Sequence, residues 1–274
     1  VMVLDKLFTA GLWEEIVLLC EEIIDDSSVE ISDTIKQYYG LALFNLQNYS
    51  LASSVLKELD QKNHKEDIFL YSILAEIKAI NHHWQDGACA NREHLIELVH
   101  QLESLKNNTQ YKSNIRIVAM LHLESAYNLG ADEKNYLENG IEIYQSYDEE
   151  IKNDTGIKYL YALCLEMNGD IESAEKVYAE FDWKDDENIA CRYLLCKLSR
   201  SEYAEAIKLY REINHTICNS KLKSLYLAAL FYDGSDLYED TLNLFISNAQ
   251  DDFGEIIDIA FGVSEKKYLQ KYII

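Results

Sequence analysis

The stretch GIKYLYALCLEMNGDIESAEKVYAEF (Gly156–Phe181) contains two apolar helical patterns separated by a short Asn-Gly-Asp break. In each half the apolar residues recur at the three- and four-residue spacing of an amphipathic helix, and Asn-Gly interrupts this spacing. A single pair of such helices cannot bury the apolar faces of both. The stretch therefore predicts a helical hairpin that must stack against neighbouring hairpins.

The same layout recurs along most of the chain. One small or apolar residue early in each second helix marks the register, and these marks are Ile16, Ala52, Ile96, Gly140, Ala174, Ala206 and Thr241. Most neighbouring marks are 32–36 residues apart, and the two intervals around Ile96 are 44 residues each. A period of about 34 residues built from two helices is typical of stacked hairpins, an α-solenoid.

The sequence therefore predicts an all-α fold, an α-α superhelix of about seven antiparallel hairpins. The chain has no proline and only 10 glycines, which favours helix over turn-rich β structure. We expect one repeat array over residues 1–252, and capping helices over 253–274 that cover the last hairpin. The predicted helices span 2–9, 12–24, 31–46, 49–60, 66–82, 91–106, 112–129, 133–148, 155–167, 171–181, 187–198, 202–213, 220–233 and 237–248.

Two kinds of residue are expected to set the packing. Small residues twelve apart, such as Ala162 and Ala174, let the two helices of a hairpin cross closely. Four residues beyond the mark come large side chains, placed to wedge between one hairpin and the next. These wedges are Leu56, Tyr178, Tyr210 and Phe245.

With these residues the pattern resembles the tetratricopeptide repeat. Gly40, Tyr49, Ala52 and Leu56 match the pattern of that family, as do Ala162, Ile171, Ala174 and Tyr178; Tyr203, Ala206 and Tyr210, and Tyr238, Thr241 and Phe245, match its second helix. The family commonly closes each repeat with proline, and this chain has none. The resemblance implies a solenoid whose concave groove receives an extended peptide or a helix of a partner protein.

Composition limits the partners. The chain carries 25 basic and 48 acidic residues, a formal charge of −23, which disfavours nucleic acid and anionic membrane as partners. A protein or peptide with basic flanks remains allowed. The six cysteines are scattered, with no Cys-x-x-Cys, and no stretch is long enough to span a membrane. We expect a cytoplasmic protein in a reducing compartment.

The best candidate for chemistry is the segment NHHWQDGACANREH. It contains the metal-ligand types His82, His83, Asp86, Cys89 and His94, but their spacing fits no zinc pattern. Paired carboxylates lie at predicted helix ends, where capping and the helix dipole favour them. We therefore predict no enzyme, no metal site and no cofactor.

The predicted binding surface is the concave groove lined by the first helix of each hairpin. The residues expected to contact a partner there are Tyr159, Leu163, Glu166, Leu195, Tyr226, Leu230 and Asp233. Two alternatives remain open: a tightly wound superhelix that fills this face with its own side chains, and binding through the convex face or loops.

The functional prediction is a scaffold for protein–protein interaction. One alternative is a ligand-sensing regulatory arm of a larger protein, since the sequence starts inside an apolar helical pattern without Met. Another is a structural subunit that self-associates into a homo-oligomer through Tyr-rich flanks.

Overall fold

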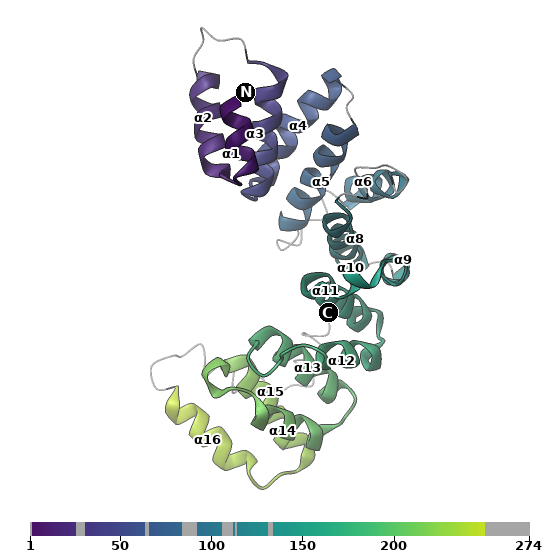
Figure 1. Cartoon of the computed structure of the whole chain (residues 1–274). Helices are drawn as coiled ribbons and strands as arrows, with labels where there is room; N and C mark the ends of the chain where they lie inside the picture. Colours follow the sequence, from purple (N-terminus) through teal and green to yellow (C-terminus); the bar gives the residue numbers. More distant parts are fainter. Residues whose placement is uncertain are drawn as a thin grey trace. The chain divides into compact units, whose positions relative to one another are not determined.

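The computed structural model describes residues 2–25, 31–63, 66–83, 92–105, 112, 114–130 and 134–249. Every regular element in these ranges is a helix (Figure 1), which confirms the all-α prediction. The chain divides into two compact units, Val1–Leu129 and Gly130–Ile274. The predicted array over 1–252 stays a prediction, and the predicted capping helices over 253–274 lie outside the described residues.

The first unit contains α1 (Met2–Thr9), α2 (Trp13–Asp25), α3 (Asp33–Asn45), α4 (Tyr49–Asn63), α5 (Glu66–His83), α6 (Arg92–Ser104) and most of α8 (Ile115–Gly130). The second contains α9 (Lys134–Gln145), α10 (Glu149–Lys152), α11 (Thr155–Asn168), α12 (Ile171–Ala179), α13 (Glu187–Ser199), α14 (Tyr203–Glu212), η3 (His215–Ile217), α15 (Ser220–Asp233) and α16 (Tyr238–Asn248). Helices α1 to α6 pack each against the next in chain order, as do helices α11 to α16.

The predicted helices are present with small shifts at their ends. The structure adds two short elements that the apolar pattern does not indicate, α10 and η3. Both follow a polar residue with extended backbone, Asp148 and Asn214 respectively. The side chain of Asn214 accepts a hydrogen bond from the backbone N–H of Thr216, so η3 depends on a local cap and not on apolar periodicity.

One turn geometry recurs in five of the described hairpins. In each, a residue with φ between 62° and 89° ends the first helix, and the next residue donates its N–H to the carbonyl five positions earlier. This is the Schellman arrangement, in which a left-handed residue lets the chain reverse direction. The left-handed residues are Gly11, Gln47, Gly169, Ser201 and Gly234.

The residues that mark the register are expected where two helices cross. A Cβ atom on Gly40 of α3 would come within 2.7 Å of the Leu56 side chain on α4, so a larger residue here would force Leu56 to shift. Ala52, Ala174 and Ala206, the register marks of α4, α12 and α14, are fully buried. The predicted close crossing is thus confirmed for α3 and α4, and it stays a prediction for the hairpins of Ala174 and Ala206.

The wedge residues are buried wherever another hairpin follows. Tyr178 on α12 packs between Ala162 of its own hairpin and Ile189 and Cys196 of the next. Leu56 and Tyr178 have no exposed surface, and Tyr210 is 6% exposed. Phe245 on α16 occupies the same register but is only partly buried. This difference separates α16 from the second helices that precede it.

Candidate functional site

The structure buries most of the side chains predicted to line a groove. Tyr159 is half-buried and Asp233 is exposed, whereas the other five lie in the interior of the second unit. The exposed fractions of these five are 8% for Leu163, 4% for Glu166, 1% for Leu195, 8% for Tyr226 and 0% for Leu230. These five side chains therefore offer little or no surface to a partner.

Specific contacts account for the burial of the polar members of this set. Glu166 accepts hydrogen bonds from the Tyr178 hydroxyl and from Nη1 of Arg192, each at 2.9 Å. These bonds satisfy a carboxylate that would otherwise be costly to bury. Burial and the nearby Glu166 carboxylate both raise the pKa of Tyr178, so its hydroxyl remains a donor. Tyr226 stacks on Tyr210 with ring centroids 4.1 Å apart and the planes 8° from parallel.

The chain therefore fills this face with its own side chains at the five buried positions. Of the seven predicted residues, the structure leaves Asp233 well exposed, at the end of α15. We place the candidate site around Asp233, at the last described hairpin.

Three helix ends bring a group of aromatic rings together beside Asp233. Phe231 and Tyr232 close α15, Tyr238 opens α16 and Tyr203 opens α14. Phe231 makes edge contacts with Tyr232 and with Tyr238, both at 5.4 Å between centroids, and Tyr203 stacks on Tyr232 at 5.4 Å. Phe231 is nevertheless 50% exposed, so the group presents one large apolar ring to solvent.

Exposed leucines and carboxylates continue this surface along α16. Leu237 is 49% exposed and Leu244 is 55% exposed, and they lie two helical turns apart on one face. We call the exposed residues of this region the terminal surface; they are Phe231, Asp233, Asp236, Leu237, Glu239, Asp240 and Leu244.

The residues of the terminal surface include no Lys, Arg or His. The sequence from 224 to 249 contains none of these cations, and Lys223 of α15 lies over the Phe245 ring, 5.9 Å from its centroid. No ion pair involves Asp233, Asp236, Glu239 or Asp240 within the part of the chain that the structure describes. Partial burial and the Glu239 carboxylate raise the pKa of Tyr238, as expected beside uncompensated negative charge. The region is therefore both apolar and acidic.

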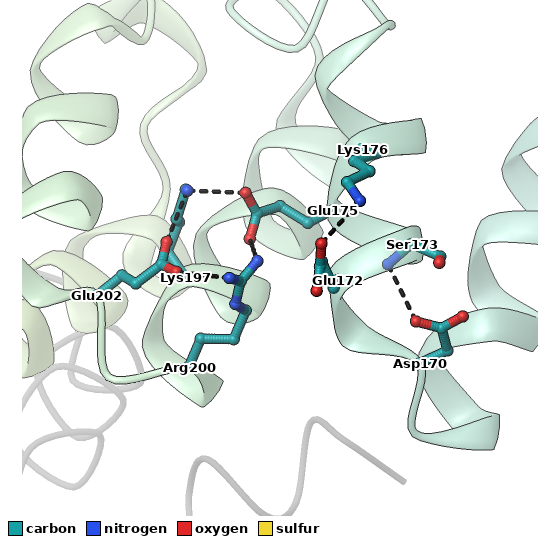
Figure 2. Close-up of polar contacts among 8 residues, drawn as sticks. All are labelled: Asp170, Glu172, Ser173, Glu175, Lys176, Lys197, Arg200 and Glu202. Atoms are coloured by element: carbon teal, nitrogen blue, oxygen red, sulfur yellow. Dashed lines mark hydrogen bonds and ion pairs between the residues drawn. The ribbon is translucent and has the colours of Figure 1, made fainter.

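A contrasting arrangement joins the two preceding hairpins. Figure 2 shows Glu175 of α12 held by two cations of the following hairpin, Lys197 at 2.7 Å and Arg200 at 2.9 Å. The same two cations also contact Glu202, at 2.7 and 3.0 Å. Lys176 pairs with Glu172 on the surface of α12. Inside the array, acidic side chains are thus neutralised by the next hairpin.

Burial raises the pKa of three of the described cysteines. The pKa of Cys164 is raised to about 12, and those of Cys20 and Cys191 to about 11, in each case mainly by burial. Since the thiolate is the reactive form, these side chains behave as apolar packing residues.

Among the five candidate metal ligands of the histidine-rich segment, the structure describes the side chain of His94. His94 lies on α6, where its Nε2 is 2.7 Å from Glu76 and the same carboxylate contacts Lys57 at 2.8 Å. The side chains of His82, His83, Asp86 and Cys89 lie outside the described residues. Within the described ranges, no group of three His, Cys, Asp or Glu residues is placed to hold a metal ion.

The hydropathy of the helices is moderate. No helix in the described ranges is both long enough and apolar enough to cross a bilayer.

Comparison with known protein families found no model that matches this chain. A comparison with curated proteins likewise found no match.

Sequence reasoning missed the apolar part of the terminal surface. Phe231, Leu237 and Leu244 fit the apolar pattern of a helix and are not among the residues predicted to contact a partner. Two features of the sequence could have indicated this surface. Residues 224–249 form the last predicted hairpin, and they contain many apolar residues but no Lys, Arg or His.

Proposed function

We propose that the chain is a scaffold for protein–protein interaction, and that the terminal surface receives the partner. The main supporting observation is the half-exposed Phe231 ring, which contacts Tyr232 and Tyr238 and is followed along the chain by four exposed carboxylates, Asp233, Asp236, Glu239 and Asp240. Aromatic side chains are enriched in protein interfaces, and an exposed apolar patch with a polar rim is typical of them.

The charge of the surface selects the class of partner. Four carboxylates within eight residues attract Lys and Arg side chains, and Phe231 offers a ring face to a cation. A partner segment that combines apolar residues with Lys or Arg complements both features. A second copy of the chain would place like charges opposite each other, which disfavours self-association through this surface.

The chain would act by binding and not by catalysis. The recurring hairpins, the small residues at helix crossings and the buried wedges all support a tetratricopeptide-like scaffold. The buried thiol side chains of Cys20, Cys164, Cys191 and Cys196 favour a reducing compartment such as the cytoplasm.

Selection from a random peptide library against the full chain tests this function. We expect the selected peptides to combine Lys or Arg with aliphatic or aromatic residues. We expect Phe231→Ala to weaken their binding by about tenfold, since one interface anchor often carries that much affinity.

Leu51→Ala is the matched control, because Leu51 on α4 is also exposed, at 39%, but lies in the first unit. The proposal fails if the selected peptides show no preference for basic residues. It also fails if they bind the Phe231→Ala and Leu51→Ala proteins equally well.

A further inference from the structure

The chain contains its own example of how a second helix is covered. Helix α13 packs against α12 and places Ile189 and Cys196 against the wedge Tyr178. Near its C-terminal end the same helix supplies Lys197, and the adjoining turn supplies Arg200, to the carboxylate of Glu175 (Figure 2). The covering helix thus provides an apolar face and cations beside it.

The next interface repeats the apolar part of this arrangement. Helix α15 packs against α14, where Tyr226 stacks on the wedge Tyr210 and Leu222 and Leu225 join the same core. In both α12 and α14, the wedge residue is buried on the side that faces the following hairpin. Each wedge packs against apolar side chains of the next helix.

Helix α16 also packs on the preceding helix of its hairpin, but no other described helix covers its outer side. Its inner side, including Tyr238 and Leu242, packs on Leu227 of α15. Of the described helices, α15 has the substantial interface with α16, and none of the α16 residues is fully buried. Figure 1 shows α16 at the edge of the second unit.

The outer side of α16 carries the groups that a covering helix would meet. Leu237 and Leu244 are seven residues apart, and Asp240 lies between them on the same face. Thus the face combines apolar side chains with a carboxylate that has no cation among the described residues.

We infer that the partner contributes an amphipathic helix with Lys or Arg beside its apolar face, which docks along α16 as α13 docks along α12. This inference rests on the proposed function and specifies the partner's structure and charge. The internal interfaces supply the precedent for the geometry, and the carboxylates of Glu239 and Asp240 supply the complementary charge.

The test uses three labelled synthetic peptides of about 18 residues, long enough to form a helix that spans α16. The first has a Leu face flanked by Lys, the second has the same Leu face flanked by Glu, and the third is the Lys peptide with two central prolines. Fluorescence anisotropy with the full chain measures each affinity. We expect the Lys helix to bind about tenfold or more tightly than either of the others, because charge and helicity both contribute.

Two variants locate the binding. Glu239→Lys combined with Asp240→Lys should weaken the Lys helix by about tenfold or more and strengthen the Glu helix, since the sign of the surface is reversed. Leu244→Glu should weaken the Lys helix by a similar factor of about ten by removing an apolar contact. The matched controls are Glu205→Lys, on the exposed side of α14, and Leu18→Glu, a 62% exposed leucine of α2. Both controls should bind the Lys helix as the unchanged chain does.

The outcomes separate this inference from the proposed function. If the proline-containing peptide binds as well as the Lys helix and Phe231→Ala weakens both, the proposed function stands and the docked helix is wrong. If no peptide binds, and library selection also yields no basic sequence, both are wrong.

Two other occupants would also overturn the inference. Carbodiimide cross-linking that joins Glu239 or Asp240 to a lysine between residues 250 and 274 of the same molecule would assign the face to the chain itself. Sedimentation that shows a dimer dissociated by Leu244→Glu would assign it to a second copy.

Discussion

Helices α12 and α16 follow the same kind of turn but differ in what covers them. Each is preceded by a glycine with positive φ, Gly169 or Gly234, and each carries an aromatic wedge, Tyr178 or Phe245. Tyr178 is completely buried because the next hairpin packs on it, while Phe245 is partly exposed. The comparison shows that the local sequence sets the hairpin, whereas the presence of a following helix decides whether its outer face is core or surface.

The largest expected effect comes from removing the two wedges. Tyr178→Ala should reduce the free energy of unfolding by about 3–5 kcal/mol, because it empties a fully buried aromatic site. Phe245→Ala should cost about 1 kcal/mol, because much less of its surface is buried. Urea denaturation followed by circular dichroism measures both.

Tyr178→Phe provides the control for this pair. It keeps the ring and loses only the hydroxyl that donates to Glu166, so we expect a loss of about 1 kcal/mol. Equal losses for Tyr178→Ala and Phe245→Ala would contradict the difference in cover.

Overpacking the two register marks should give the next largest difference. Ala174→Leu should cost about 1–3 kcal/mol, because Ala174 is fully buried at a predicted close helix crossing. Thr241→Leu on α16 should change the free energy of unfolding by less than about 0.5 kcal/mol, because Thr241 is only half-buried. Thermal unfolding of the two proteins measures this difference, and a larger loss for Thr241→Leu would show that α16 is covered in solution.

The charged groups of the two helices should also respond in opposite ways. Lys197→Met should lower the free energy of unfolding by about 1–3 kcal/mol, because it removes one of the two cations that pair with Glu175 and Glu202. Asp240→Asn should leave stability unchanged or raise it slightly, since it relieves repulsion on an acidic surface. Destabilisation of the chain by Asp240→Asn would indicate a cation that pairs with Asp240.

The Lys197 effect should depend on pH in a defined direction. Hydrogen bonding to Lys197 lowers the pKa of Glu202 below its ordinary value of 4.5. Burial alone would lower the pKa of Lys197, but its hydrogen bonds to Glu175 and Glu202 outweigh burial and raise this pKa above 10.5. A carboxyl with a lowered folded-state pKa stabilises the fold above the unfolded pKa and loses this effect as the pH falls.

The stability difference between the unchanged chain and Lys197→Met should therefore be full near neutral pH. It should shrink when the pH falls through the folded-state pKa of Glu202, or rises through that of Lys197. Urea midpoints at several pH values measure it, and a difference that grows on acidification would rule out this network as its source.

The smallest expected effects concern the turn that the two helices share. Gly169→Ala and Gly234→Ala should each cost about 1 kcal/mol, because a Cβ atom is unfavourable at positive φ. Ser201 has the equivalent positive φ in the turn before α14, so Ser201→Gly should raise the free energy of unfolding by less than about 1 kcal/mol. Differential scanning calorimetry would detect these shifts, and opposite signs for Gly169→Ala and Gly234→Ala would mean that the two turns are not equivalent.

Much of the local structure follows from short-range patterns in the sequence. The spacing of apolar residues and the Asn-Gly and Asp-Gly breaks predict the helices to within a few residues. The register marks and wedges follow from the repeat, as Ala174 and Tyr178 show. The short elements α10 and η3 escape prediction, because four- and three-residue helices carry no periodicity.

The groove could not be predicted with the same success, for a physical reason. Whether a first-helix residue faces solvent depends on how closely successive hairpins approach, which is a tertiary property. Leu195 and Leu230 join one core, and Glu166 is held by Arg192 from the next hairpin. The terminal surface is visible only in the structure, which shows α16 packed on α15 and not covered by another of the described helices.

Amide hydrogen exchange of α12 and α16, measured in the full chain with and without the Lys-flanked helical peptide, tests the central claim most directly. We predict that α12 is already strongly protected and does not change, while α16 exchanges faster alone and slows when the peptide is added. Equal protection of the two helices without peptide, or slowing confined to helices other than α15 and α16, would contradict the claim that this face awaits a partner.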